Sequence, residues 1–325
     1  MLGVPMATLL CLGLAVFGLD YLHHMPGPVP GGSLDKGKAV LIPSGTPTLR
    51  IGQILAQEGV IEWPWLFVMA SHWPLQSPPL KAGEYLIPSR ASVAQIVAQL
   101  RGGRTVMHSL TVPEGLTSAQ IVALVRAEPL LAGTIPAVPP EGTLLPDTYG
   151  FSRGDSREGM IARMTSAMRR AVTELWSARV AGLPYRSMDE AVVMASIVEK
   201  ETGLAAERRR IAGVFVNRLK RGMRLQADPT VIYGLTQGEG ALGRPLTRAD
   251  WLHNSPYNTY VIDGLPPRPI ANPGRAALEA ALDPMPHDDL YFVATGQGGH
   301  AFARTLEDHN EHVTKAARDL TKTRN

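Results

Sequence analysis

The chain has 325 residues, of which 45% are hydrophobic, with a formal net charge of +3 and a sequence pI near 9.0. This length supports two or three domains with substantial cores. So small a net charge is not that of a dedicated nucleic-acid binder, although residues 208–224 are locally basic, and we predict no nucleic-acid partner. The single cysteine, Cys11, leaves no disulfide to form, which is compatible with an oxidising compartment.

The first predicted element is an apolar segment at residues 1–22. No charged residue occurs from Leu2 to Leu19, and extension to Leu22 gives a comfortable length for a membrane-spanning helix. A basic leader and a small-residue cleavage site are both missing, so we predict a retained anchor rather than a cleaved signal peptide. The first basic residue is Lys36, so the charge pattern does not predict the orientation of this anchor.

A linker rich in Pro and Gly is predicted at residues 23–37, followed by a small module at residues 38–126. Within the module, a short apolar piece, a Pro- or Gly-containing turn and an amphipathic segment recur three times, with the amphipathic segments at 51–55, 93–98 and 119–123. We interpret each copy as a strand, a turn and a helix. A shared solution for the turn before a short helix would explain the same recurrence without any function.

The remainder of the chain predicts a second linker at residues 127–146 and a larger domain at 147–325. Helices are expected at about 157–182, 188–202 and 205–221. A strand at 290–294 and a return strand at 300–302 would form a hairpin before a final helix that begins near Thr305. The predicted fold class is therefore α+β.

Two glutamates near the end of the helix at 188–202 are candidates for acid catalysis. At 100° per residue, Met194, Ile197 and Val198 form an apolar stripe that includes Glu201, whereas Glu199 points nearly the opposite way. Burial penalises the charged form of a carboxyl group, so Glu201 is a candidate general acid. The alternative is a structural glutamate that is paired with a buried arginine or caps a neighbouring backbone.

Two polar clusters follow this helix. The segment 255–260, with its neighbours 264–267 and 272–274, places aromatic and amide side chains among prolines, a mixture that suits carbohydrate binding. A second cluster lies at 226–233, where Asp228 precedes Pro229. All of these residue types are also ordinary turn formers.

Metal and nucleotide sites are not predicted. His300, His309 and His312 are close in sequence, but neither a cysteine partner nor an HExxH pattern accompanies them. The glycine-rich segment at 296–299 lacks the Lys-Ser/Thr pair of a phosphate-binding loop, and no G-x-S-x-G motif is present for a serine nucleophile.

Four segments together resemble the signature blocks of the endolytic murein transglycosylases of the YceG-like family. Their order and spacing also match, and the resemblance covers nearly the whole chain, with a LysM-like module at 38–126 and the catalytic domain at 147–325. Only the stretch 236–244 is longer than expected. The four blocks are Ala195–Thr202, Arg224–Gly234, Tyr257–Tyr260 with Gly264–Pro267, and Tyr291–Ala294 with Gly298–His300.

The resemblance implies cleavage of the β-1,4 bond between N-acetylmuramic acid and N-acetylglucosamine without water, giving 1,6-anhydro ends and helping to terminate glycan elongation. The resemblance implies no cofactor. It implies that the partners are peptidoglycan strands and peptidoglycan synthases. It also implies a single-pass inner-membrane protein whose catalytic domain lies outside the cytoplasm. Glu201 would be the catalytic acid, with Glu199 as runner-up and Glu207 a more distant one. A non-catalytic murein-binding scaffold and a hydrolytic muramidase are the alternatives. The substrate-binding candidates are Gln226, Asp228, Thr230, Tyr233, Tyr257, Asn258, Thr259, Tyr260 and His300.

Overall fold

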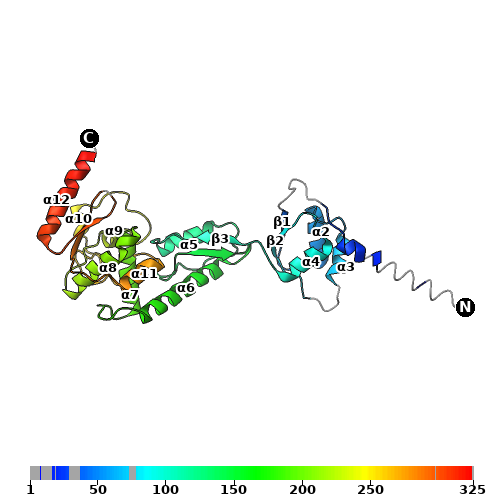
Figure 1. Ribbon diagram of the computed structural model, residues 1–325, viewed down its shortest axis with the longest axis horizontal. Helices are drawn as coiled ribbons and strands as arrows, with labels where there is room; N and C mark the ends of the chain where they lie inside the picture. Colours follow the sequence, from blue (N-terminus) through cyan, green and yellow to red (C-terminus); the bar gives the residue numbers. More distant parts are fainter. Residues whose placement is uncertain are drawn as a thin grey trace. The chain divides into compact units, whose positions relative to one another are not determined.

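The computed structural model describes residues 8, 17, 18, 20–28, 37–72, 78–296 and 298–323 (Figure 1). The chain divides into two compact units. The smaller unit comprises residues 1–108 and 150–155, and the larger unit comprises residues 109–149 and 156–325. The mixed α and β character expected from the sequence is confirmed.

The smaller unit packs three helices around a two-stranded sheet. Strand β1 (Lys38–Ile42) pairs antiparallel with β2 (Gly83–Ile87), so that Lys38 lies opposite Ile87. The helices are α2 (Thr48–Gln57), α3 (Pro64–Ser71) and α4 (Val93–Gly102). A capping box between Ser92 and Gln95 starts α4 at the predicted place. The buried side chains of Leu55, Tyr85 and Ile96 lie in one continuous core.

The predicted anchor at residues 1–22 falls mostly outside the described residues. Within the part of the chain that the structure describes, no helix has both the length and the apolar character needed to cross a membrane.

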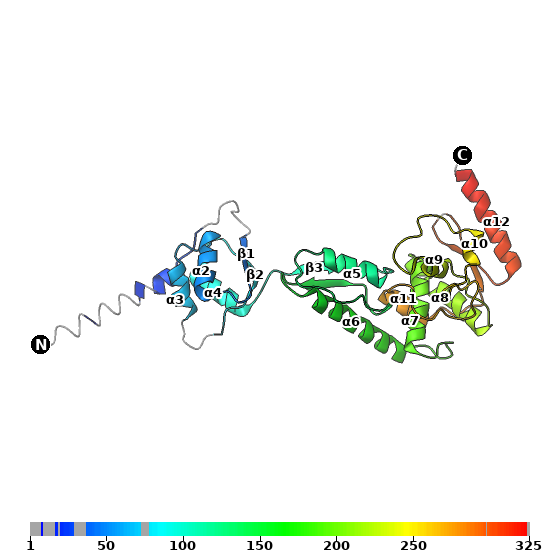
Figure 2. The ribbon, with the colours of Figure 1, turned by 180° about the vertical axis from the view of Figure 1, so that it is seen from behind.

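The third copy of the strand-turn-helix pattern lies mainly in the larger unit. Strand β3 (His108–Thr111) pairs with β4 (Thr148–Phe151), and helix α5 (Ser118–Ala127) packs against the long helix α6 (Arg157–Ser177). These two helices lie side by side in Figure 1 and, seen from behind, in Figure 2. The predicted end of the small module at residue 126 therefore differs from the observed division, because α5 packs on α6 rather than on the smaller unit.

The predicted linker at 127–146 is instead a packed part of the larger unit. Leu131, Ile135, Leu144 and Leu145 are all buried. The Pro and Gly content was therefore misleading, because these residues shape a fixed irregular path whose apolar side chains still enter the core.

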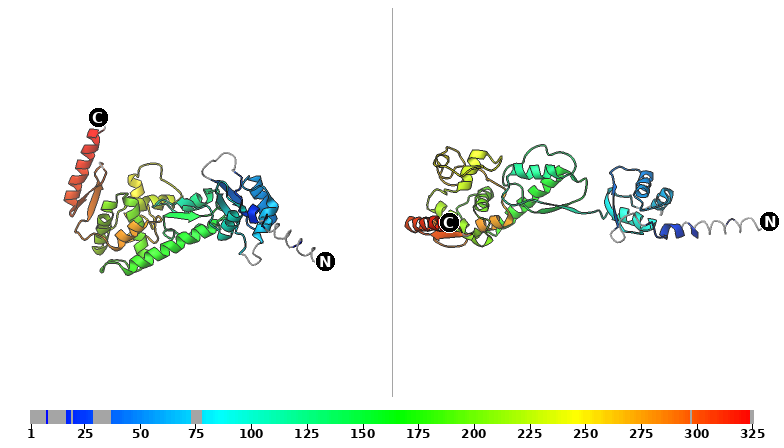
Figure 3. Two further views of the ribbon diagram at one scale, coloured as in Figure 1. Left: turned by 45° about the vertical axis from the view of Figure 1, so that its right-hand side comes forward. Right: turned by 90° about the horizontal axis from the view of Figure 1, so that it is seen from above.

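The centre of the larger unit is a group of three helices: α7 (Met188–Glu201), α8 (Ala205–Lys220) and α11 (Arg275–Leu282). They lie together in both views of Figure 3. Helix α9 (Asp228–Thr236) packs against α7, and the short α10 (Arg248–Trp251) packs against α9. The predicted hairpin is observed as β5 (Tyr291–Ala294) and β6 (His300–Ala303), against which α12 (Leu306–Thr323) packs.

Candidate active site

Helix α7 is buried on all sides along its middle. Every residue from Ala191 to Val198 is buried, and even the Ser196 hydroxyl is used internally, accepting a hydrogen bond from the Ile270 backbone N–H at 3.0 Å. The apolar stripe inferred from the sequence is therefore not the single buried face of this helix. Glu199 and Glu201 differ instead in what surrounds each carboxylate at the C-terminal end of α7.

Glu199 is held by groups from other elements. Its side chain is only 6% exposed, its Oε2 accepts a hydrogen bond from the Gly274 N–H at 2.9 Å, and its Oε1 lies 3.7 Å from Arg208 Nη2. Gly274 is the N-cap residue of α11, so Glu199 ties the end of α7 to the start of α11. Burial raises the pKa of Glu199, while the Gly274 hydrogen bond opposes this shift. These contacts are those expected of a structural carboxylate.

Glu201 is the last residue of α7 and is half-buried. No hydrogen bond to its carboxyl group is found within the described part of the chain. Burial raises its pKa from 4.5 to about 8, the negative charge of Asp228 adds to the increase, and the positive charge of Arg218 opposes it. A carboxyl group in this setting carries a proton at neutral pH and is free to donate it.

Arg218 is a site residue that the sequence reasoning missed. Its guanidinium is buried, with Nε donating to the Leu290 carbonyl at 2.6 Å and Nη1 donating to the Leu225 carbonyl at 2.7 Å. The guanidinium also lies 5.1 Å from the ring centroid of Tyr291, and burial lowers the pKa of Arg218. Arg218 therefore brings a positive charge to Glu201 and fixes the two segments beside it.

Two arginines of the locally basic run at residues 208–224 point into the protein. Arg208 and Arg218 are both buried, together with Ile211 and Phe215. These four positions are three, four and three residues apart, which places them on one helical face. That spacing was the available signal that the two arginines point inward.

Gln226 occupies an unusual backbone conformation next to Arg218. Its φ of +53° lies in the left-handed region that residues other than glycine rarely adopt. The conformation is maintained by a backbone hydrogen bond to the Thr259 carbonyl at 3.1 Å, and the exposed side chain lies with its Oε1 3.4 Å from Arg218 Nη1. Strain of this kind is typical of functional sites, so this predicted substrate contact remains a candidate.

Two of the predicted substrate residues, Asp228 and Tyr260, meet directly. The Tyr260 hydroxyl donates to Asp228 Oδ1 at 2.7 Å, and Trp251 Nε1, which the sequence reasoning missed, donates to the same oxygen at 3.0 Å. Burial raises the pKa of Tyr260, with the Asp228 hydrogen bond and charge adding to the shift. Since Asp228 and Glu201 also interact electrostatically, these side chains belong to one polar surface.

Three other predicted substrate residues are internal scaffold. Thr230, Asn258 and Thr259 are 0% exposed. The two threonine hydroxyls bond each other at 2.8 Å, and Asn258 Nδ2 donates to the backbone carbonyls of Trp251 and His253 at 3.1 and 2.8 Å. With no accessible surface, these side chains do not contact a ligand directly, and their role is to shape the loops that carry Trp251 and Tyr260.

The remaining candidates form pairs of their own. The rings of Tyr233 and Tyr257 are 4.8 Å apart, and burial raises the pKa of Tyr233 to about 12, with Glu141 and Tyr257 adding. His300 Nδ1 lies 2.7 Å from Glu207 Oε2. Burial by itself would raise the pKa of Glu207, but the hydrogen bonds from the ring and backbone of His300 outweigh it and lower the pKa. Glu207 is therefore engaged with His300 rather than poised as a free acid.

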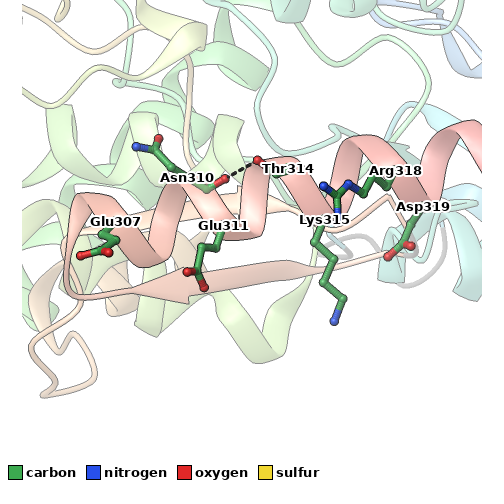
Figure 4. A pocket seen from close by; sticks show the side chains of 7 residues that line it. All are labelled: Glu307, Asn310, Glu311, Thr314, Lys315, Arg318 and Asp319. Carbon is green, nitrogen blue, oxygen red and sulfur yellow. Dashed lines mark hydrogen bonds between the residues drawn. The ribbon is translucent and has the colours of Figure 1, made fainter.

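The histidines near the C-terminal end serve separate contacts. The His309 ring stacks on Tyr291 with centroids 5.3 Å apart, and His312 borders a hollow of about 410 Å³ between the β5–β6 hairpin and α12. A second hollow, of about 630 Å³, runs along α12 (Figure 4), and neither lining includes Glu201.

In the described residues, the one group whose side chains could jointly hold a metal ion consists of Asp20, His23 and His24 in the smaller unit.

The sequence model of the YceG-like family matches residues 40–315. The chain belongs to the YceG-like family. This confirms the family resemblance of the sequence blocks, and the mixed α and β structure described above is thus a YceG-like fold. The chain is similar to a yceG-like protein from Listeria monocytogenes whose crystal structure is known. The two share 33% sequence identity with a TM-score of 0.50, and the match covers 85% of this chain and 99% of that one.

Members of the YceG-like family with similar sequences are named endolytic murein transglycosylase. One from Bacillus subtilis is 32% identical over 313 residues, covering 84% of this chain and 83% of its own length. One from Streptococcus pneumoniae is 28% identical over 347 residues and covers 92% of this chain. The chain spans 62% of the length of that streptococcal relative.

Proposed function

We propose that this YceG-like protein is a lytic murein transglycosylase whose catalytic acid is Glu201. The observation that carries the proposal is the half-buried Glu201 carboxyl group, which burial keeps protonated at neutral pH and which no hydrogen bond from another described residue occupies. The relatives named endolytic murein transglycosylase in Bacillus and Streptococcus support peptidoglycan as the substrate.

In the proposed reaction, Glu201 acts first as an acid and then as a base. Its proton passes to the glycosidic oxygen as the bond from C1 of N-acetylmuramic acid to that oxygen breaks. The resulting carboxylate then accepts the proton of the same sugar's C6 hydroxyl, whose oxygen bonds to C1 and closes the 1,6-anhydro ring. The 2-acetamido group of the same sugar assists at C1. Atoms balance without water, and Glu201 ends protonated for the next cycle.

Mass spectrometry of the products of purified sacculi tests this proposal. We expect muropeptides that end in 1,6-anhydro-N-acetylmuramic acid, and their absence would leave a non-catalytic murein-binding scaffold as the better description. The neighbouring carboxylate Asp228 makes hydrolysis a specific second candidate, because hydrolytic glycosidases generally use two carboxyl groups. Products with reducing N-acetylmuramic acid ends would establish that muramidase reaction instead.

The activity of the wild-type protein should fall as the pH rises through about 8. The acid form of Glu201 is required, and it is the predominant form below that pKa. The measurement is kcat/KM on soluble glycan oligomers between pH 5 and pH 9.5. An alkaline limb near pH 5 would contradict the assignment, because it would mean that the essential acid has an ordinary carboxyl pKa.

We extend the proposal to the cellular setting of the reaction. The apolar residues 2–22 act as a single-pass anchor in the cytoplasmic membrane, and the chain from residue 38 onward lies outside the cytoplasm, where peptidoglycan strands are made. Cleavage of nascent strands there would terminate their elongation beside the synthases, and the module after residue 38 would act as a LysM-like element. Protease treatment of spheroplasts tests the topology: both units should be digested, and their protection would contradict it.

A further inference from the structure

We propose that Trp251, Tyr260 and Asp228 form a glycan-binding subsite beside the catalytic acid, in which Trp251 stacks on a sugar ring and Asp228 accepts a hydrogen bond from the sugar. This inference deepens the proposed function and rests on it for the identity of the ligand as a β-1,4-linked amino-sugar strand. Trp251 is the component of this subsite that the sequence patterns did not single out.

The protein holds Trp251 in place with a dedicated scaffold. Trp251 ends the short helix α10, whose first turn is closed by a capping box between Thr247 and Asp250. Arg244 binds both carboxylate oxygens of Asp250, at 2.6 and 2.9 Å. The side-chain amide of the fully buried Asn258 donates a hydrogen bond to the Trp251 backbone carbonyl at 3.1 Å. The extra length noted around 236–244 thus leads into a rigid support for one indole ring.

The arrangement of the three side chains leaves aromatic ring surface and one carboxylate oxygen accessible to a ligand. The rings of Trp251 and Tyr260 are 6.0 Å apart and inclined by 32°, and both remain partly exposed. Their N–H and O–H groups both bond Asp228 Oδ1, at 3.0 and 2.7 Å. Within the described residues no hydrogen bond reaches Oδ2 of this exposed carboxylate. One oxygen therefore fixes the orientation of Asp228, and the other is available to a ligand.

This chemistry fits an amino sugar. The C–H face of a pyranose ring packs on an indole, while its hydroxyl groups and N-acetyl N–H donate hydrogen bonds that a carboxylate oxygen accepts. Asp228 is the first residue of α9, which packs against the helix α7 that ends at Glu201, so a sugar held here lies near the reacting bond. The subsite would position the strand for proton donation, and we expect its loss to affect KM more than kcat.

Calorimetric titration of full-length protein with a defined GlcNAc–MurNAc hexasaccharide tests the subsite. The parent is the Glu201→Gln variant, which prevents cleavage during the measurement. Adding Trp251→Ala should weaken binding roughly tenfold to a hundredfold, as is typical for loss of an aromatic anchor. Adding Trp251→Phe, which keeps a ring but loses the N–H donor to Asp228, should give an intermediate loss. Unchanged affinity in both variants would overturn the proposal.

The matched control is Trp176→Phe, because Trp176 belongs to the same unit but lies in α6, where its ring centroid is 4.0 Å from the Arg179 guanidinium carbon. This variant should bind like the parent. If Trp251→Ala does not fold, Trp251→Phe and Asp228→Ala decide the test by the same titration. Cleavage of sacculi by the wild type is measured in parallel. If binding depends on Trp251 but no cleavage occurs, the subsite is supported and the proposed enzymatic activity is refuted. If cleavage occurs but binding does not depend on Trp251, the activity is supported and the subsite is refuted.

Discussion

Glu201→Gln is expected to abolish cleavage while the larger unit stays folded. The amide has nearly the shape of the acid but no proton to donate, so the rate should fall by about a thousandfold or more. Folding should be maintained because no hydrogen bond to the Glu201 carboxyl is found in the described structure. The measurement is the yield of 1,6-anhydro products per unit time, together with circular dichroism of both proteins.

The control for this variant is Glu199→Gln. The new amide oxygen can still accept the hydrogen bond from the Gly274 N–H, so the link between α7 and α11 is kept and only the 3.7 Å ion pair with Arg208 is lost. Most of the activity should therefore remain. Loss of activity in Glu199→Gln with retention in Glu201→Gln would transfer the acid role to Glu199.

The same substitution at Glu201 should stabilise the protein in a pH-dependent way. Between pH 4.5 and about 8 the folded protein binds the Glu201 proton and the unfolded chain has released it. The free energy of unfolding of the wild type therefore falls with rising pH in this window, by at most about 1.4 kcal/mol per pH unit from this group. Glu201→Gln removes this pH-dependent contribution to the free energy of unfolding. Urea unfolding should therefore show equal stabilities for the wild type and the variant near pH 4.5, and a more stable variant at pH 8.

Arg218→Leu should cause the largest loss of stability. The leucine side chain cannot replace the hydrogen bonds to the carbonyls of Leu225 and Leu290, which would be left buried without partners. We expect the free energy of unfolding to fall by about 3 to 5 kcal/mol, as for other broken buried charge networks. Urea unfolding at pH 7 measures the change.

Arg221→Leu is the matched control, because Arg221 is an exposed arginine just past the end of the same helix. Its effect should stay within about 0.5 kcal/mol, the usual range for surface substitutions. Equal effects of the two variants would show that the buried guanidinium is not a structural centre. Where Arg218→Leu remains folded, its alkaline activity limb should move to higher pH, because the positive charge that favours ionised Glu201 is gone.

Local sequence signals predicted the elements around the site well. Helix α7, which Ser187 caps, and the hairpin of β5 and β6 are both determined by neighbouring residues, and the structure has these elements where they were expected. The domain boundary was not predictable in this way. Helix α5 repeats the sequence pattern of α4, and only its packing on α6 assigns it to the larger unit.

The roles of individual polar residues depended on contacts that sequence spacing does not contain. Asn258 and Thr259 have the composition of a sugar-binding loop, yet they lie inside it and hold its shape. Trp251 approaches the site from a separate segment, so no local pattern identified it, whereas the spacing of Arg218 with Ile211 and Phe215 was a local signal that was not used. The selection of Glu201 over Glu199 rested on a single apolar face of α7. The structure distinguishes the two by their contacts: the Glu199 carboxylate accepts a hydrogen bond from Gly274, whereas no described residue donates one to the Glu201 carboxyl group.

The stacking of His309 on Tyr291, beneath which Arg218 lies, has a consequence for biogenesis. Arg218, whose charge acts on Glu201, is held by the Leu290 carbonyl and the Tyr291 ring, which lie about seventy residues later in the chain. Pairings so far apart in sequence form late and slowly. The surroundings of the acid at position 201 are therefore completed only when the C-terminal hairpin of the larger unit has folded.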